Sequence, residues 1–324
     1  MDFDLNDDQE ALLSSLASIR QRYSELPSEE RRARSYFAPG LQEALYEGGY
    51  FDAAQIGGLE AALVVLAIGE SPCVAETGAS ALVVPHLDLP DRRGPFALLS
   101  GDLTRAQRFL PVARQALVDL GDDVAVIPVN ADEVETVETI YAYPYGKFRR
   151  APSLAKAPRL GKAAVATLRQ WWRVAIAAES AAAAQSAVDF TVDYVKQRHL
   201  FGKPIASFQG VQHRIAACHQ IARGMRFLAL HAAWTGAPYD ADVAASYAQQ
   251  HMQKLVFDLH QFNGGMGVTN EHKLHFWTYR FRALQSEAGG VNAAALDTAE
   301  MLWGPPASPQ VDRVAVRTGR LAAE

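Results

Sequence analysis

Apolar side chains recur with two different periods along the chain, and the change of period divides it into three parts. Residues 1–86 and 158–304 carry apolar positions at helical spacing, whereas 87–157 contains short apolar runs broken by Gly, Pro and Asp. We therefore predict a mainly α-helical protein with a small β domain. The predicted parts are an N-terminal helical domain over 1–86, a middle β domain over 87–157, a C-terminal four-helix bundle over 158–304 and a tail over 305–324.

Individual stripes and caps place the elements within these parts. Asn6 precedes several acidic residues and an apolar stripe, which predicts a first helix over 3–23, and a second apolar run covers 61–69. The middle part has β-like runs at 96–99, 109–112, 116–120, 124–129 and 136–140. Later helices are expected at 167–197, 212–234, 240–262, 271–286 and 293–302. Small residues along one face of the first of these permit close packing in a bundle.

Composition narrows the possible function classes. The 324 residues carry a formal net charge of −5, which gives no support for nucleic-acid binding. No apolar run approaches the length of a membrane span, and the acidic N-terminus lacks a signal-peptide core. Cys73 and Cys218 form no metal or redox motif, so we interpret both as buried thiols in a reducing compartment. We expect a cytoplasmic protein that binds neither nucleic acid nor membrane.

A short loop interrupts the helical pattern at 198–209, where the sequence reads Arg-His-Leu-Phe-Gly-Lys-Pro-Ile-Ala-Ser-Phe-Gln. Arg198 offers a cation for phosphate, Phe201 an aromatic face, and Gly202 with Pro204 a stiff turn. This junction suits an anionic, planar ligand, although a structural loop between two core helices explains it equally well. A second segment favours the ligand, because its sequence His-Gln-Phe-Asn-Gly-Gly-Met-Gly-Val-Thr at 260–269 allows close backbone approach.

These two segments, in this order, resemble the C-terminal helical domain of the acyl-CoA dehydrogenases. The resemblance continues through Ser-Phe-Gln-Gly-Val-Gln-His at 207–213 and Asn-Glu-His at 270–272. It implies an acyl-CoA dehydrogenase-like fold with FAD as the cofactor. In that family, the two motifs hold the ADP half of FAD across a subunit interface. The implied flavin contacts in this sequence are Arg198, Phe201, Phe208, Gln209, Gln261, Gly264 and Gly265.

Motifs that serve the other half of the flavin are absent from the sequence. Family members have a Thr-Glu-Pro-Gly-type turn and a Trp-Ile-x-Asn-Gly strand, which enclose the isoalloxazine ring and help to bind the acyl-CoA, and neither occurs here. The family also uses a Glu to remove the α proton of the thioester. Counted without gaps from Gly264, the usual position of this Glu falls on Ala288, and the alternative position, on the helix before Arg198, falls on Trp172. Glu287 lies one residue from the first, so a one-residue deletion would restore it as the catalytic base.

Other groups receive structural interpretations. We interpret Glu179 as a charge on a helix face or an interface partner rather than as a base. Trp171 and Trp172 are expected in the core or at an interface. The histidines show no metal-ligand spacing, so no metal site is predicted, and His272 and His275 are expected at a surface or interface.

A chain with the ADP-side motifs but without the ring-side motifs looks like the non-catalytic subunit of a heteromeric acyl-CoA dehydrogenase. Such short subunits are known in the family as partners in α2β2 assemblies, notably for the degradation of steroid side chains as CoA thioesters. The resemblance implies FAD, an acyl-CoA substrate, a homologous catalytic partner subunit and an electron-transfer flavoprotein as acceptor. Two alternatives stay open, a self-sufficient homo-oligomer that uses Glu287 and a non-enzymatic relative of the family.

Overall fold

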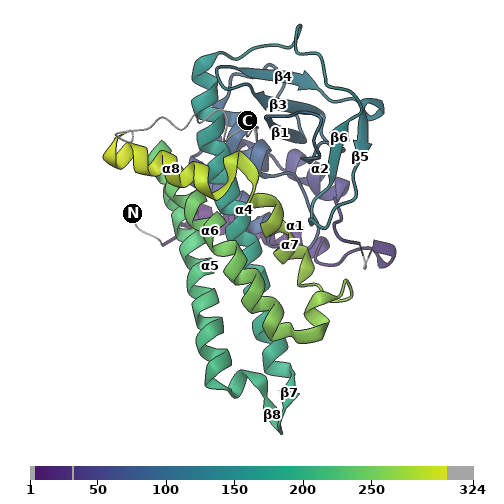
Figure 1. Cartoon of the computed structure of the whole chain (residues 1–324), viewed down its shortest axis with the longest axis vertical. Helices are drawn as coiled ribbons and strands as arrows, with labels where there is room; N and C mark the ends of the chain where they lie inside the picture. The colour runs from purple at the N-terminus through teal and green to yellow at the C-terminus, as the bar shows by residue number, and fades with distance from the viewer. Residues whose placement is uncertain (1–3, 31–32, 305–324) are drawn as a thin grey trace, which may run out of the picture.

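The computed structural model describes residues 4–30 and 33–304, so the predicted tail over 305–324 lies outside the described residues. Helices come first along the chain, then strands, then a second and longer set of helices. Figure 1 shows the long helices side by side, with the sheets against one end of them. This arrangement confirms the predicted fold class, a mainly α-helical protein with small sheets.

The N-terminal helices pack around one largely apolar helix. Helix α3 (Gly58–Gly69) has every residue from 61 to 68 buried, which places it at the centre of this part. Asn6 caps α1 through a capping box, in which the side chains of Asn6 and Gln9 each accept from the other's backbone N–H. The other helical segments here are α1 (Asp7–Arg22), η1 (Ser28–Glu30), α2 (Pro39–Glu47), η2 (Tyr50–Gln55), the π-helix η3 (Gly78–Val83) and η4 (Val84–His86).

Two three-stranded sheets form the middle part. In the first, β3 pairs in parallel with β1 and antiparallel with β4, and in the second, β6 pairs antiparallel with both β2 and β5. The bounds are β1 (Phe96–Ser100), β2 (Gln107–Arg108), β3 (Gln115–Asp119), β4 (Val124–Pro128), η5 (Ala131–Glu133), β5 (Val134–Thr136) and β6 (Tyr145–Phe148).

The prediction of a strand over 109–112 is wrong. Phe109 has a φ of 62°, and the backbone N–H groups of Val112 and Ala113 bond back to its carbonyl, so the chain turns there directly after β2. The predicted strand over 136–140 is also misplaced, because β5 ends at Thr136.

The later helices form the bundle. They are α4 (Lys162–Gln197), α5 (Gln209–Thr235), α6 (Pro238–Asn263), α7 (His275–Leu284) and α8 (Gly290–Trp303), with η6 (Ile205–Ser207), η7 (Gly264–Val268) and η8 (Glu287–Gly289) between them. Helix α4 is 36 residues long, about 54 Å at 1.5 Å per residue, and reaches from the sheets to the far end of the bundle. There a hairpin of β7 (His199–Leu200) and β8 (Lys203–Pro204) leads into α5 (Figure 1).

Arg280 of α7 ties the bundle to the N-terminal helices. Its guanidinium donates to the carbonyl oxygens of Gly69, Ser71 and Pro72 at 2.8 to 2.9 Å. These bonds from a buried Arg to carbonyls at and just after the end of α3 fix where that helix stops against α7. None of the helices within the described ranges has the length and apolarity that a membrane span requires.

Candidate functional site

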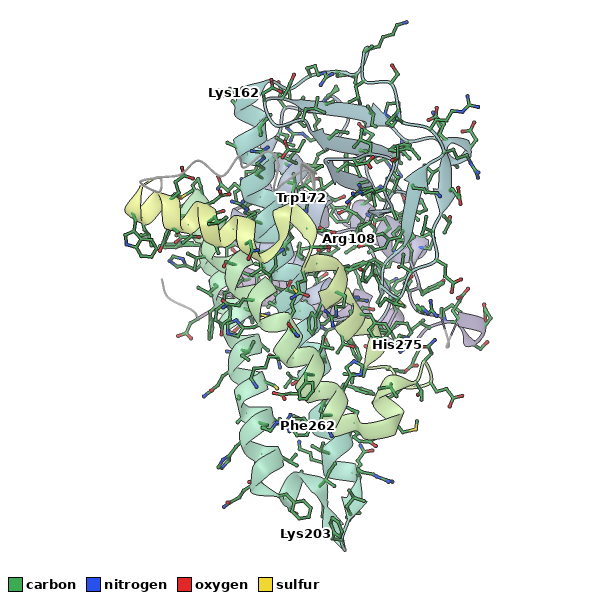
Figure 2. The ribbon with its side chains drawn as sticks, viewed as in Figure 1. Arg108, Lys162, Trp172, Lys203, Phe262 and His275 are labelled. Carbon is green, nitrogen blue, oxygen red and sulfur yellow. The ribbon has the colours of Figure 1, made fainter. Side chains whose placement is uncertain are left out.

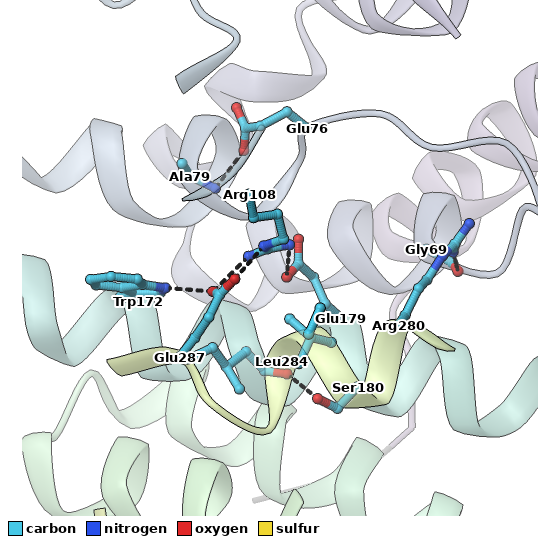
Figure 3. A network of polar contacts seen from close by, with 12 residues as sticks. Gly69, Glu76, Ala79, Arg108, Trp172, Glu179, Ser180, Arg280, Leu284 and Glu287 are labelled. Atoms are coloured by element: carbon cyan, nitrogen blue, oxygen red, sulfur yellow. Dashed lines mark hydrogen bonds and ion pairs between the residues drawn. The ribbon is translucent and has the colours of Figure 1, made fainter. Parts of the chain in front are cut away.

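A buried ion cluster lies where the sheets meet the bundle. Arg108 of β2 donates from Nη1 to Glu179 of α4 at 2.8 Å, and from Nε and Nη2 to the two carboxylate oxygens of Glu287 of η8 at 2.5 and 2.9 Å. The three side chains are only 9%, 5% and 13% exposed. Figure 3 shows this cluster, which joins one strand, the longest helix and the turn between α7 and α8.

Further contacts hold the cluster rigid. The indole Nε1 of Trp172 donates to Glu287 at 3.0 Å, so this carboxylate accepts three hydrogen bonds in total. The Arg108 guanidinium also lies 4.9 Å from the ring centre of Phe109 and 4.7 Å from that of Tyr143. Burial acts to lower the pKa of Arg108, but the charges of Glu179 and Glu287 raise it, so Arg108 stays charged.

Two carboxylates share this single guanidinium, and the side chain of Glu179 is more deeply buried than that of Glu287. Burial raises the pKa of Glu179 to about 7, the charge of Glu287 adds to this shift, and Arg108 opposes it. The interpretation of Glu179 as a charge on a helix face is therefore wrong, because α4 is buried on all sides at this point.

A third carboxylate, Glu76, lies nearby, is buried, and is held mostly by backbone N–H groups. It accepts from the N–H groups of Ala79, Ser80 and Phe96 and from the Ser80 hydroxyl at 2.6 to 3.3 Å. Burial raises the pKa of Glu76. Glu76, Arg108 and Glu287 line a cavity of only about 10 Å³, which holds at most one water molecule. This junction does not fit an isoalloxazine ring as it stands.

The predicted ADP-side contacts lie at the opposite end of the bundle. Arg198 follows the last turn of α4, and Gln209 begins α5. Phe201 has a φ of 54° and is 91% exposed at the tip of the β7–β8 hairpin. Its ring packs edge to face on the half-buried Phe208, with ring centres 6.4 Å apart. In Figure 2, Lys203 of this hairpin lies far from Arg108.

The glycine segment lies at the end of α6. Gln261 is in the last turn of this helix, and Gly264 and Gly265 begin η7, with a φ of 58° at Gly264. A Cβ atom on either glycine would meet nothing within 4 Å, so the space beside this backbone is open. These residues fit a ligand that approaches the backbone closely.

One hydrogen bond relates the two motifs in space. Asn263 donates from Nδ2 to the Thr191 hydroxyl of α4 at 2.9 Å, and Thr191 lies seven residues before Arg198, about 10 Å along that helix. The structure thus brings both motifs to one end of the bundle. All predicted flavin contacts except Phe208 are exposed, so one chain presents them as an open surface rather than a pocket.

Comparison with known proteins identifies the bundle. Residues 161–301 match the family model "Acyl-CoA dehydrogenase, C-terminal domain". The C-terminal domain belongs to the acyl-CoA dehydrogenase family. FAD is the cofactor of this family.

Acyl-CoA dehydrogenase IpdE2 of Mycobacterium tuberculosis is 32% identical over 107 residues, which cover 33% of this chain and 34% of the relative. FadE34 of the same organism is 36% identical over 122 residues, which cover 36% of this chain and 17% of that protein. The chain thus covers about a third or less of these relatives.

Solved structures extend the fold to nearly the whole chain. One chain of the ChsE4-ChsE5 complex from M. tuberculosis superposes with a TM-score of 0.79 at 18% identity, covering 95% of this chain and 100% of that one. Butyryl-CoA dehydrogenase from Megasphaera elsdenii gives a TM-score of 0.76 at 16% identity, covering 93% and 100%. At these identities the superpositions establish the acyl-CoA dehydrogenase fold.

Sequence reasoning placed Trp171 and Trp172 correctly, misplaced His272 and His275, and missed Arg108. Trp171 and Trp172 are buried, as predicted. His272 and His275 are not at a surface, because both are buried, and His275 bonds to the carbonyls of His272 and Ala33. Arg108 was missed, since nothing in its local sequence distinguishes it from a surface arginine on a short strand. Within 4–30 and 33–304, no three His, Cys, Asp or Glu side chains are grouped as metal ligands.

Proposed function

We propose that this chain is the non-catalytic subunit of a heteromeric, FAD-dependent acyl-CoA dehydrogenase. In this proposal it supplies ADP-side contacts to FAD, and a homologous catalytic subunit supplies the base in an α2β2 assembly. The proposed reaction is α,β-desaturation of an acyl-CoA thioester, with an electron-transfer flavoprotein as acceptor. The proposal of acyl-CoA dehydrogenase chemistry is based on the match of residues 161–301 to the C-terminal domain of that family.

The observation that carries the proposal is the state of Glu287. A base that removes an α proton needs a free carboxylate oxygen within reach of the substrate. Here both oxygens of Glu287 accept charge-assisted hydrogen bonds from Arg108, and one also accepts from Trp172. The adjoining cavity of about 10 Å³ has no room for a thioester. This arrangement supports a role for Glu287 in structure, with the base on the partner.

The bundle end supports the cofactor assignment. Bound FAD would supply the hydride acceptor. Arg198 would neutralise a phosphate, and the open backbone at Gly264 and Gly265 would allow the dinucleotide to approach closely. Because the contacts are exposed in one chain, a second chain would have to cover the ligand. This supports an interface site that two subunits share.

One observation favours a second candidate, a homo-oligomer with Glu287 as its own base. Glu287 lies in the α7–α8 turn, between the sheets and the bundle, one residue from the position that the family resemblance implies. For this candidate, Arg108 would have to leave the carboxylate before substrate binds. The two candidates predict different flavin stoichiometries.

We expect flavin to depend on the partner. The chain purified alone should be largely free of FAD, because an exposed ADP-binding surface without a ring site retains little. Co-expressed with a homologous catalytic acyl-CoA dehydrogenase subunit, the purified complex should contain one FAD per heterodimer, measured by flavin absorbance against protein concentration. A stoichiometric flavin spectrum from the chain alone would favour the homo-oligomer instead.

We also propose a bulky acyl group, such as one derived from a steroid. One structural neighbour is described as the "Tcur3481-Tcur3483 steroid ACAD", with a TM-score of 0.70 at 20% identity. A small middle domain opposite the catalytic subunit would leave room for a polycyclic group. We expect a higher kcat/KM for a steroid-side-chain CoA ester than for butyryl-CoA on the purified complex. A preference for butyryl-CoA would contradict the substrate assignment and leave the subunit assignment intact.

A further inference from the structure

The last six residues of α6 are attached to three neighbouring helices by their own polar side chains. Asp258 bonds to Arg214 of α5, His260 to Thr278 of α7, and Asn263 to Thr191 of α4. We call residues 258–263 the anchored turn. Gln261 lies inside it, and Gly264 follows it directly.

The contact to α5 is an ion cluster on a buried carboxylate. Asp258 is 3% exposed and accepts from the Arg214 guanidinium and, at 2.6 Å, from Lys254 Nζ. These cations lower the pKa of Asp258 although burial opposes them, so it is ionised at neutral pH. The Arg214 guanidinium also lies 4.9 Å from the ring centre of Phe262, which holds that side of the turn against α5.

The other two contacts are neutral hydrogen bonds. Nε2 of His260 and the Thr278 hydroxyl are 2.8 Å apart, and burial lowers the pKa of His260, so this ring is uncharged at neutral pH. Asn263 donates to Thr191 at 2.9 Å and also to the carbonyl of Leu259 at 2.8 Å. Thr191 and Thr278 are fully buried, so these bonds are shielded from water.

These contacts leave one face of the turn free. At about 100° per residue from Asp258, Asn263 lies at about 140° and His260 at about 200° around α6, and Gln261 lies at about 300°, in the open sector between His260 and Asp258. Gln261 and the preceding Phe257 on that side are exposed, in agreement with this placement. Apolar packing alone tolerates small rotations of a helix, whereas three directional bonds fix its rotation and its end point. The anchored turn therefore determines where Gln261 and Gly264 lie relative to Arg198.

We propose that Asp258, His260 and Asn263, with their partners Thr191, Thr278 and Arg214, are positioning residues for the flavin contacts of the Gln261–Gly265 segment. None of them is assigned a contact with the ligand. The proposal rests on the proposed function, because it takes Gln261 and Gly265 as FAD contacts. It adds that FAD affinity depends on hydrogen bonds buried behind the binding surface.

The sharpest test uses a matched pair at Thr191. Thr191→Val keeps the shape but removes the hydroxyl that accepts from Asn263, whereas Thr191→Ser keeps it. In the complex with the partner, we expect Thr191→Val to raise the Kd for FAD about three- to tenfold, the effect of one buried hydrogen bond expressed in binding. Thr191→Ser should stay within about twofold of the wild type, and kcat at saturating FAD should change little in both.

A control separates positioning from general stability. Asp297→Asn removes the ion pair of α8 with Arg173 of α4, at 2.5 Å, which is not part of the anchored turn. It should lower Tm without changing the Kd for FAD. The positioning proposal is overturned if Thr191→Val lowers Tm but leaves the Kd for FAD unchanged while Gln261→Ala weakens FAD binding. If Gln261→Ala itself has no effect, the proposed flavin site is wrong, and the positioning role is overturned with it.

Discussion

Arg108→Leu is expected to lower the free energy of unfolding by about 3–5 kcal/mol, because it leaves two carboxylates without their cation in a buried site. Glu179 and Glu287 receive three hydrogen bonds from this guanidinium, and only Trp172 would remain as a donor to Glu287. The same change also detaches β2 from α4 and from the α7–α8 turn. Urea unfolding of the complex, followed by circular dichroism, measures the loss.

A triple variant provides the control for this effect. Replacing Arg108 and Glu179 by Leu and Glu287 by Gln removes the buried charges together, and such replacements of ion clusters are often neutral or stabilising. We expect the triple variant to recover most of the stability that Arg108→Leu loses. Equal destabilisation of the single and triple variants would mean that packing around Phe109 and Tyr143, rather than unpaired charge, causes the loss.

The pH dependence of the same measurement tests the charge argument independently. The pKa of Glu179 is raised from 4.5 to about 7 in the folded state. Between these values the folded protein binds more protons than the unfolded chain, so the contribution of Glu179 to stability is complete below about pH 4.5 and is lost as pH rises towards 7. Arg108 opposes this rise, so Arg108→Leu should raise the pKa of Glu179 further, and ionising Glu179 then costs more stability than in the wild type. The defect of Arg108→Leu should therefore be larger at about pH 8 than at about pH 5, and Glu179→Gln should flatten this dependence.

The helical architecture could be predicted because its signal is local and repeated. The stripes that predicted helices over 212–234 and 240–262 correspond to α5 and α6, which extend only a few residues further at each end. The middle part was harder, because its strands are two to five residues long. A run such as 109–112 is apolar enough for a strand, yet the tertiary structure turns the chain at Phe109.

The flavin-contact motifs could be predicted from the sequence and the ion cluster around Arg108 could not, because only the motifs are local in the chain. The residues from Arg198 to Gln209 and from Gln261 to Gly265 form contiguous motifs, so their chemistry is visible in sequence. The ion cluster joins Arg108 to Glu287, 179 positions away, and no local pattern announces that pairing. Glu179 was misjudged because periodicity cannot identify an exposed face on a helix whose residues from 171 to 184 are all buried.

Arg198→Ala is expected to weaken FAD retention by the complex more than Glu287→Gln alters turnover. Loss of a guanidinium that faces a phosphate removes a contact worth about 1.5–3 kcal/mol, which corresponds to a roughly 10- to 150-fold higher Kd. Arg105→Ala provides a matched control, because this exposed arginine lies before β2, in the sheet region at the other end of the molecule.

Glu287→Gln completes the comparison and decides between the two candidate functions. It retains an oxygen that can accept from Arg108 or Trp172, and if the base lies on the partner, turnover of the complex should stay within a few-fold of the wild type. If Glu287→Gln instead reduces turnover by more than about a hundredfold with FAD still bound, Glu287 is the base. Arg108 would then have to release that carboxylate during each catalytic cycle. The ion cluster would be the resting state of an active site rather than a purely structural contact.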